Sequence, residues 1–574
     1  MKKLFVVLCL SMFLATITTV GYPLLDQSDT ISKIIFNDSS ESKYESENIS
    51  NKDAFTEERY TVVHVLMSYD QYEPLDNSMI TDSKVDDLVK LNREKGKEYH
   101  QSKNRELSLK LGLDEEKDFY SSMYTPFVTF KLDVTDEVDV KTKLKNYANS
   151  DDVELIYADV ADTSNIKSEM STMFGDIGLG SYSSYSNYNG YDGTGVVIGI
   201  LEYGGACLFG SGGLVDENHA NFVGVDLEIR NEWYCNEKVS DHATLVASIA
   251  GGNTGIAREA KILSVQTDAL DYSSEFDWML DRDVNVVNMS ISDAGMNGYY
   301  TGNAAFLDFI VRNYWVTIVK SSGNNGGDIT SPGTGYNIIT VGSISNSSTL
   351  STFSSWEENF TISKPNLVAP GSSISAGTMG PASGTSLSAP HVTGAIALMM
   401  DRSSTLKAHP EVVMAIIQAT ADSSNLVSTY NDYDSSGLEE KIGAGMLRVD
   451  RAVDFVYKRS YPTLTNNDYY RTYIREKRVY LSNGDDLQAS LVWLKNIYPD
   501  GTSGALTPKS STDLDLKLFS PSGALVAYSN SNSYNQEFIR YTATSTGYYT
   551  LKIYQYGNYA TYGTEYIGLA YWYN

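Results

Sequence analysis

Ser386 has the setting that a nucleophilic hydroxyl requires. It stands in GTSLSAPHVTGAIALMM (residues 384–400), between a glycine-bearing turn and a strongly apolar run that predicts a buried helix. Pro390 would fall in the first turn of this helix, where its missing N–H does little harm. The hydroxyl would then lie at the positive end of the helix, beside backbone N–H groups that could bind an oxyanion. A serine that merely caps a structural helix would give the same pattern.

A base must accompany Ser386, because a serine hydroxyl is a weak nucleophile until a neighbour takes its proton. His391 follows Ser386 by five positions and would point about 140° away around the helix. The other candidates are His219 and His409, and His409 begins another predicted helix. His242 begins DHATLVASIAGG, a predicted helix whose small residues permit close packing. His242 is therefore the predicted base, although a lone histidine is often structural.

Five short apolar runs predict the sheet that must position these groups. They are continuously apolar and are followed by loop or helix signals, which is typical of parallel strands covered on both faces. We therefore predict a doubly wound α/β domain with a mostly parallel sheet over residues 166–457. Taken alone, Glu202 at the end of the first run reads as the point where a strand meets solvent. The runs are GVVIGIL, KILSVQT, VNVVNMS, WVTIVKSS and IITVGSI.

The chain before this domain divides into three predicted segments. Residues 1–21 have a basic start and a short apolar core, which is typical of a secretory signal peptide. Residues 22–56 are rich in Ser, Asp, Asn and Glu and predict a disordered leader. Residues 57–165 contain three strand-like runs and two helix-like stretches, one of them long and charged near 84–111, and predict a small α+β unit.

Residues 458–574 change to an alternating pattern. Runs such as DLDLKLFS, FIRYTA and GYYTLKIYQY are separated by Gly, Ser and Asn turns and predict an antiparallel β-sandwich or barrel. Asp513 and Asp515 could present carboxylates to calcium, although alternating Asp on a strand more often indicates a solvated face. No run after the signal reaches the roughly 18 to 20 apolar residues of a membrane span, so we expect no membrane attachment after signal removal.

The net charge restricts the possible binding partners, and the cysteines bear on the redox state of the chain. The net charge of −28 and the pI of about 4.6 argue against nucleic acid and anionic membranes. Cys9 lies inside the signal, which leaves Cys207 and Cys235. In an exported chain these two could form a disulfide, and two buried reduced thiols are the alternative.

Several motifs in chain order resemble those of the subtilisin-like serine proteases, the subtilases. GTSLSAPH is similar to the serine motif of that family, DHATLVASIAG to its histidine motif and SSGNNGG to the segment that supplies a side-chain oxyanion donor, here Asn324. The similarity covers roughly residues 190 to 455. It implies a subtilisin-like fold in which Ser386 attacks, His242 shuttles the proton and Asn324 stabilises the oxyanion.

The same resemblance extends to the flanking units. It implies that residues 57–165 form an inhibitory propeptide, which assists folding and then occupies the cleft, although the long charged helix is an expansion. It implies that residues 458–574 form the β-sandwich or jelly-roll domain that many secreted subtilases carry. The expected partners are therefore protein or peptide substrates and the chain's own propeptide.

The acid departs from the family pattern. Subtilases have an aspartate at the end of the first strand, whereas this sequence has Glu202, followed by Tyr203. Asp192 lies about 20 Å away at the other end of the strand, and Asp241 adjoins His242 and would diverge from it. Glu202 is thus the predicted acid. Sedolisins also pair a serine with a glutamate, but they lack the histidine that this chain retains.

The expected function is a secreted serine endopeptidase that needs no cofactor for its chemistry, with structural calcium as an addition. One alternative is a binding or scaffold protein that kept the fold and lost catalysis, which the changes at Glu202, Ala243 and Leu245 allow. Another is a processing protease for one particular peptide. We expect Glu202→Asp to retain or raise activity and Glu202→Ala nearly to abolish it.

Overall fold

The computed structural model describes most of the chain after residue 59. Cys207, Cys235 and the predicted signal segment lie outside the described residues, so the disulfide and the signal peptide remain predictions. The structure describes residues 34–38, 60–69, 72–78, 80–133, 137–160, 177–179, 185–204, 212–230, 239–267, 271–292, 298–346, 349–357, 363–424, 426, 429–430, 432–464, 473–496, 512–556 and 564–574.

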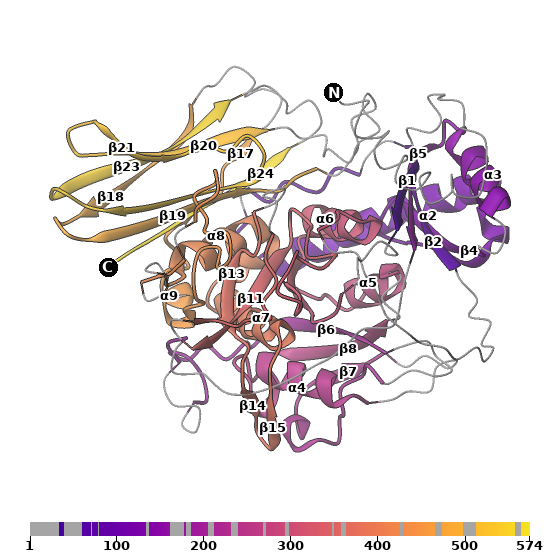
Figure 1. Cartoon of the computed structure of the whole chain (residues 1–574), viewed down its shortest axis with the longest axis horizontal. Helices are drawn as coiled ribbons and strands as arrows, with labels where there is room; N and C mark the ends of the chain where they lie inside the picture. The colour runs from indigo at the N-terminus through magenta and orange to yellow at the C-terminus, as the bar shows by residue number, and fades with distance from the viewer. Residues whose placement is uncertain are drawn as a thin grey trace, which may run out of the picture.

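An eight-stranded sheet forms the centre of the molecule (Figure 1). Its strand order is β12-β11-β10-β9-β6-β8-β7, and β13 also pairs with β11. Every pairing is parallel except that of β11 with β12, so the predicted parallel sheet is confirmed, and the five predicted runs are β6, β8, β9, β10 and β11. The strands are β6 (Val197–Tyr203), β7 (Leu227–Ile229), β8 (Lys261–Thr267), β9 (Val286–Met289), β10 (Thr317–Ser321), β11 (Ile339–Asn346), β12 (Thr349–Leu350) and β13 (Leu367–Pro370).

Helices cover both faces of this sheet. The helices α4 (Asp241–Ala250), α7 (Thr385–Arg402), α8 (Pro410–Thr420) and α9 (Val449–Asp454) share one hydrophobic core with the sheet, and α5 (Ser273–Leu280) and α6 (Gly302–Tyr314) share another. Helices α4 and α7 approach closely because Gly394 lacks a side chain: a Cβ there would lie 2.7 Å from the carbonyl oxygen of Ala250. A two-stranded hairpin, β14 (Ile374–Ala376) and β15 (Met379–Ala382), precedes α7.

The N-terminal unit has its own five-stranded sheet, in the order β1-β5-β2-β4-β3. The two helices predicted from sequence are present, and β2, β4 and β5 are the three predicted strands. The prediction of disorder for residues 22–56 is wrong for β1, because its backbone extends the edge of the sheet by parallel pairing with β5. The elements are β1 (Ile34–Asp38), β2 (Tyr60–Met67), α2 (Val85–Leu111), β3 (Lys117–Ser121), β4 (Phe127–Asp133), α3 (Glu137–Ala148) and β5 (Val153–Val160).

The N-terminal unit packs against α5 and α6 of the central domain. Arg93, on α2, is 2% exposed, and its Nη2 donates to the carbonyl oxygen of Val284 at 2.6 Å. A side chain at Gly96 would overlap the ring of Tyr314, so the glycine lets α2 lie against the end of α6. The contact is therefore a close-packed interface with buried polar groups. No helix among the described residues is both long enough and apolar enough to cross a membrane.

The C-terminal residues form two antiparallel sheets, which lie together at one side of Figure 1. The sheets enclose a common hydrophobic core that includes Trp493, Leu516 and Tyr549. One sheet has the order β16-β24-β19-β22, with β17 also beside β24, and the other has the order β18-β23-β20-β21. The strands are β16 (Arg459–Ser460), β17 (Thr463–Leu464), β18 (Tyr473–Leu481), β19 (Asp486–Trp493), β20 (Asp513–Phe519), β21 (Leu525–Ser529), β22 (Gln536–Thr542), β23 (Gly547–Tyr556) and β24 (Glu565–Tyr573).

Asp513 and Asp515 do not form the solvated face that their alternation favoured. Asp515 is 5% exposed and pairs with Lys517 at 3.2 Å, and Asp513 is half-buried. Burial and the neighbouring Asp515 raise the pKa of Asp513 to about 6. Burial of a strand face depends on contacts from elsewhere in the chain, which a strand pattern alone does not reveal.

Buried polar contacts join these sheets to the central domain. Gln418, on α8, donates from Nε2 to Oε1 of Gln536 at 2.7 Å and accepts from the hydroxyl of Ser490 at 2.6 Å. Strand β24 runs so close to α8 that a Cβ on Gly568 would lie 2.5 Å from the carbonyl oxygen of Glu411. The C-terminal sheets are therefore fixed to the helical face that also supports α7.

Candidate active site

Glu202 and His242 meet at the carboxyl end of β6. Oε2 of Glu202 lies 2.8 Å from Nδ1 of His242, although 40 positions separate the two residues in the sequence. Glu202 is 2% exposed, so its carboxylate is withdrawn from water and depends on this partner. His242 lies in the first turn of α4, where the hydroxyl of Ser240 accepts the backbone N–H of Ala243 and fixes the start of the helix. The structure thus brings the predicted acid and base together.

The contact with Glu202 determines the state of the imidazole. Burial disfavours the imidazolium of His242, but the negative charge and the hydrogen bond of Glu202 outweigh this effect and raise the pKa of His242. In neutral His242 the carboxylate retains the proton on Nδ1, which leaves Nε2 as an acceptor. An unprotonated Nε2 is what a general base needs. The side chain is 20% exposed, so it is not completely enclosed.

The residues after Glu202 serve packing. Tyr203 is half-buried and packs against the core formed with α5 and α6. A Cβ on Gly204 would lie 2.8 Å from the side chain of Gln266, so the backbone after Glu202 passes close to β8. The end of β6 is thus held tightly enough to fix the carboxylate.

Ser386 lies in the first turn of α7, as predicted. The helix begins at Thr385, so the backbone N–H of Ser386 has no acceptor within the helix and points toward its open N-terminal end. Ser290, just after β9, donates from Oγ to the carbonyl oxygen of Ser386 at 2.6 Å and fixes the backbone. Ser386 is 5% exposed, and its Oγ has no hydrogen-bond partner among the described residues. The nucleophile and the base are therefore not in hydrogen-bond contact in this state.

Asn324 is held with its amide nitrogen toward the same place. Its Oδ1 accepts from the backbone N–H of Thr385 at 2.8 Å and from the hydroxyl of Thr385 at 2.9 Å. The hydroxyl of Thr385 in turn accepts the N–H of Gly323 at 3.1 Å. Nδ2 of Asn324 and Oγ of Ser386 lie 3.3 Å and 2.9 Å from the point that a Cβ on Gly384 would occupy. The amide donor and the hydroxyl therefore border one small space, which only a glycine at 384 leaves open.

The competing residues lie elsewhere. His391 contacts the carbonyl oxygen of Leu387 at 2.7 Å, and burial lowers its pKa to about 4. His409 is buried against Glu411 at 2.9 Å. Asp192 accepts hydrogen bonds from Thr194 in the turn before β6, at the opposite end of that strand from Glu202. None of these groups reaches Ser386.

The supporting roles of three residues were not predicted from the sequence. Thr385 stands inside the quoted serine motif and orients Asn324, and Ser290 stands at the end of VNVVNMS, where parallel strands deliver site residues. Lys320 is fully buried just before SSGNNGG, and its Nζ donates to the carbonyl oxygen of Ser321 at 2.5 Å. The position of Ser290 after a strand was a usable signal, whereas a lysine within an apolar run gave none.

The described residues contain no group of three or more His, Cys, Asp or Glu side chains that could hold a metal ion. Structural calcium therefore remains an expectation.

This arrangement defines a class of protein: an α/β domain that presents a paired acid and imidazole, and near them a serine and an amide donor at a helix N-terminus, has the parts of a serine hydrolase. Residues 193–445 match the model of Peptidase_S8, the subtilase family. Residues 193–445 are therefore similar to the subtilase family.

Curated relatives show the same similarity. A subtilisin-like protease of Coccidioides posadasii is 30% identical over 254 residues, which are 40% of this chain and 54% of the relative. Subtilisin E of Bacillus subtilis is 28% identical over 183 residues, 28% of this chain and 46% of the relative. The chain thus spans about half the length of the curated relatives it matches.

Solved structures give weaker similarities. A cold adapted subtilisin-like serine proteinase has a TM-score of 0.35 and 23% identity, covering 49% of this chain and 98% of that one. The prenylagaramide maturation protease PagA has a TM-score of 0.37 and 23% identity, covering 45% of this chain and 92% of that one.

Proposed function

We propose that this chain is a secreted serine endopeptidase that uses Ser386, His242 and Glu202 in place of the usual Ser-His-Asp set. The observation that carries the proposal is the 2.8 Å contact between Glu202 and His242. A glutamate keeps the imidazole in the tautomer that accepts a proton on Nε2 and stabilises the imidazolium that follows. The retained histidine and the placement of Asn324 support the same conclusion.

Peptide hydrolysis would proceed by acyl transfer. Ser386 Oγ attacks the scissile carbonyl carbon while His242 Nε2 takes the hydroxyl proton, and Asn324 Nδ2 and the Ser386 N–H stabilise the oxyanion. The imidazolium then gives its proton to the leaving amine, and the C–N bond breaks. Water, deprotonated by His242, releases the acyl group and restores Ser386. Closure of the space between Ser386 and His242 would accompany substrate binding, because catalytic hydrogen bonds are often long before substrate arrives.

We propose further roles for the flanking units. The α+β unit is the chain's inhibitory propeptide, supported by its close-packed contact with α5 and α6 through Arg93 and Gly96. The C-terminal sheets form an appended β-sandwich of the jelly-roll kind. The N-terminal segment 1–21 directs secretion.

The proposal is tested with Ser386→Ala. Substrate hydrolysis and release of the N-terminal unit are followed together in the full chain, wild type beside variant. Both should stop in Ser386→Ala, because each requires the acyl-enzyme. Persistence of either at the full rate would remove Ser386 from its role.

A catalytically inactive scaffold is the second candidate, and one observation favours it: Oγ of Ser386 makes no hydrogen bond to any described residue. Such a protein would bind peptides without cleaving them. Incubation of wild type with a mixed peptide library, read by mass spectrometry, distinguishes the candidates. New termini absent from the Ser386→Ala sample indicate an enzyme, and a single cleavage motif would identify a processing protease.

A further inference from the structure

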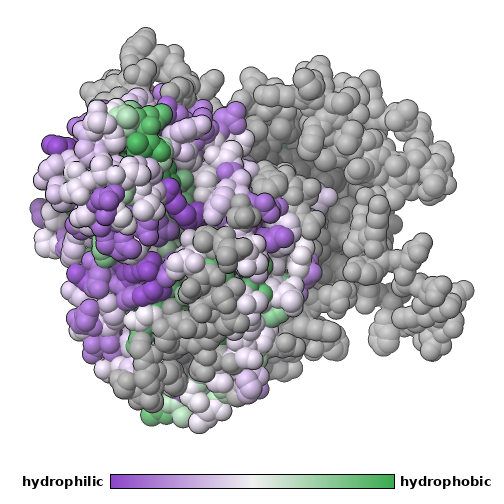
Figure 2. All heavy atoms as spheres, turned by 60° about the vertical axis from the view of Figure 1, so that its left-hand side comes forward, coloured by the Kyte–Doolittle hydropathy of each residue, from purple (hydrophilic) through white to green (hydrophobic). Residues whose placement is uncertain are grey.

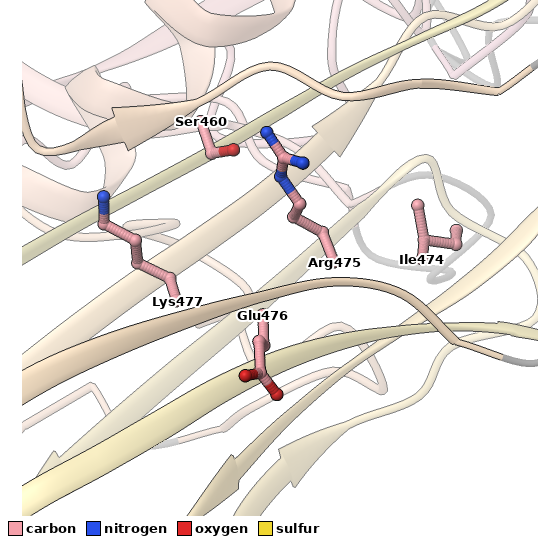
Figure 3. Close-up of a pocket in the computed structure, with 5 residues that line it drawn as sticks. All are labelled: Ser460, Ile474, Arg475, Glu476 and Lys477. Atoms are coloured by element: carbon pink, nitrogen blue, oxygen red, sulfur yellow. The ribbon is translucent and has the colours of Figure 1, made fainter.

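An open cavity of about 430 Å³ lies between the edges of the two C-terminal sheets (Figure 3). Ser460 on β16 lines one side, and four consecutive residues of β18 line the other: Ile474, Arg475, Glu476 and Lys477. In Figure 3 the side chains of Arg475 and Lys477 point to the side where Ser460 lies, and Glu476 points the opposite way. The cavity is therefore bordered by two cations and a hydroxyl, with the carboxylate turned out of it.

The two cations occupy positions that elsewhere on β18 face the core. Arg475, Lys477, Val479 and Leu481 alternate along the strand and share one face. Val479 is 3% exposed and Leu481 is fully buried, so this face points between the sheets. A register shift between Tyr473 and Arg475 adds one residue to the strand at this end. Such a bulge re-aims the side chains beside it, which here places charge at the mouth of an apolar core.

Neither cation has an acidic partner among the residues that the structure describes. Arg475 and Lys477 form no ion pair with any described residue, whereas Glu476 pairs with Lys552 at 3.6 Å on the other face of the sheet. Two like charges about 7 Å apart on one strand face repel each other, so an anion between them would stabilise both.

The surroundings extend this positive region. Lys458 and Arg459 directly precede Ser460. Their bonded partners are neutral: Arg459 donates to the hydroxyls of Ser403 and Thr405, and Lys458 to the hydroxyl of Tyr573. In a chain with a net charge of −28 this concentration of cations is local. Figure 2 turns the C-terminal side forward, and the coloured part of the surface there is mainly hydrophilic.

We propose that this cavity is a binding site for an anionic group carried on a body about the size of a sugar, with Arg475 and Lys477 as the charged contacts. Arginine binds carboxylate and phosphate through two parallel N–H donors, and lysine adds a compact charge. The volume exceeds that of an isolated oxyanion and falls in the range of small-ligand pockets. Ser460 supplies a hydroxyl opposite the cations, and Ile474 supplies an apolar contact for the attached body.

Inward charge on an edge strand has a second known use, since it prevents pairing with the edge of another chain. Strand β18 is an edge strand, so the two explanations must be separated by experiment. Protection of the edge requires only charge and predicts aggregation when the charge is removed. A ligand site predicts saturable binding that depends on these two side chains.

The experiment measures binding by calorimetry to full-length protein carrying Ser386→Ala, which prevents self-digestion. The probes are inorganic phosphate and oligogalacturonate, at low and high salt. The variant is Arg475→Gln with Lys477→Gln. Arg478→Gln is the matched control, because Arg478 lies on the same strand but its guanidinium stacks over the ring of Tyr548 at 4.4 Å. Arg475→Lys with Lys477→Arg keeps the charge if the glutamine variant aggregates.

At least one probe should bind the parent and Arg478→Gln within about twofold of each other, and the double glutamine variant should lose at least tenfold in affinity. The charge-keeping variant should retain binding of phosphate. Tighter binding of the oligogalacturonate identifies a polymer as the source of the anion, and tighter binding of phosphate identifies a free ligand. Binding of neither probe to the parent, or equal binding to the parent and the double glutamine variant, would overturn the proposal.

Discussion

Glu202 and His242 form the closest contact of the proposed triad, 2.8 Å between Oε2 and Nδ1. The carboxylate reaches the imidazole from the end of β6, where the backbone is held by parallel pairing of Glu202 with Gln266 on β8. The extra methylene relative to an aspartate is therefore used to span the gap. This relationship changes one expectation drawn from the sequence.

Glu202→Asp should lower kcat/KM, and the sequence-based expectation that it retains or raises activity is revised. With the backbone held, the shorter side chain withdraws the carboxylate by about one C–C bond, 1.5 Å, which breaks the hydrogen bond. Glu202→Ala should reduce kcat by about 10⁴, as loss of the acid does in related triads. Steady-state hydrolysis of one peptide by both variants measures this. Full activity of Glu202→Ala would assign the acid to another residue.

The acid limb of the pH profile should report His242. Because Glu202 raises the pKa of His242, the imidazole stays protonated to higher pH, and kcat/KM should rise at a higher pH than an unperturbed histidine would give. In Glu202→Gln the negative charge is gone and burial dominates, so the limb should move to lower pH while the maximum rate falls. Profiles of kcat/KM between pH 5 and 9 test the shift. A limb that does not move would show that Glu202 does not set this pKa.

Asn324→Ala should reduce kcat by about 10² to 10³ with a smaller change in KM, because the donor acts on the oxyanion and not on bound substrate.

Thr385→Val should reduce kcat by about 10-fold or more, since it frees the amide that Thr385 orients. Thr385→Ser is the matched control, because it keeps the hydroxyl. A purely structural role for Thr385 would lower the free energy of unfolding in Thr385→Val without a selective loss of kcat.

Asp277 should make attachment of the N-terminal unit depend on pH. It is 1% exposed on α5, and it accepts hydrogen bonds from Tyr120 and from the N–H of Met123 in that unit. Burial raises its pKa to about 7, so the docked form holds a proton that a solvent-exposed carboxyl releases near pH 4. Protonation of Asp277 therefore favours docking fully below pH 4. This contribution is lost as the pH rises from 4 to 7 and does not change further above pH 7.

The measurement compares dissociation constants of the separately cleaved unit for wild type and Asp277→Asn. Their ratio should rise with pH between about 4 and 7, by up to about 10-fold per unit, and then level off. The ratio is used because His100, whose pKa burial lowers to about 3, contributes a trend of opposite sign in both proteins. A ratio that is constant across this range would show that Asp277 stays ionised in the docked state.

Gly568→Ala should destabilise the whole protein by about 1 to 3 kcal/mol, because the new methyl group would overlap the backbone of Glu411. Gly327→Ala is the matched control, since a Cβ there meets only one atom, at 3.8 Å. Urea unfolding of both variants in the Ser386→Ala background gives the comparison. An unchanged midpoint for Gly568→Ala would mean that β24 separates from α8 at little cost.

Local sequence patterns predicted the strands of the central sheet and two of the site residues, Ser386 and His242. Continuous apolar runs identified β6, β8, β9, β10 and β11, and the small residues of α4 pointed to His242. Such signals are local because burial on both faces acts on every residue of a strand. Glu202 was recognisable only from its correspondence to a family position, since a carboxylate after an apolar run is ordinarily exposed.

The remaining features depend on contacts between distant parts of the chain. Strand β1 could not be expected within a polar leader, because its pairing partner β5 lies more than 100 positions away. The burial of Asp515 depends on the packing of the C-terminal sheets. Ser290 donates one hydrogen bond to Ser386 and Thr385 donates two to Asn324, and no periodic pattern in the sequence records such contacts.

The central claim is that Glu202 and His242 activate Ser386. It is tested most directly by labelling with a fluorophosphonate probe, which reacts only with an activated serine hydroxyl, followed by peptide mapping. Wild type should carry one adduct on Ser386, Ser386→Ala should carry none, and Glu202→Ala should label at least 10²-fold more slowly. Absence of the adduct in wild type freed of its N-terminal unit, or equal labelling rates for wild type and Glu202→Ala, would contradict it.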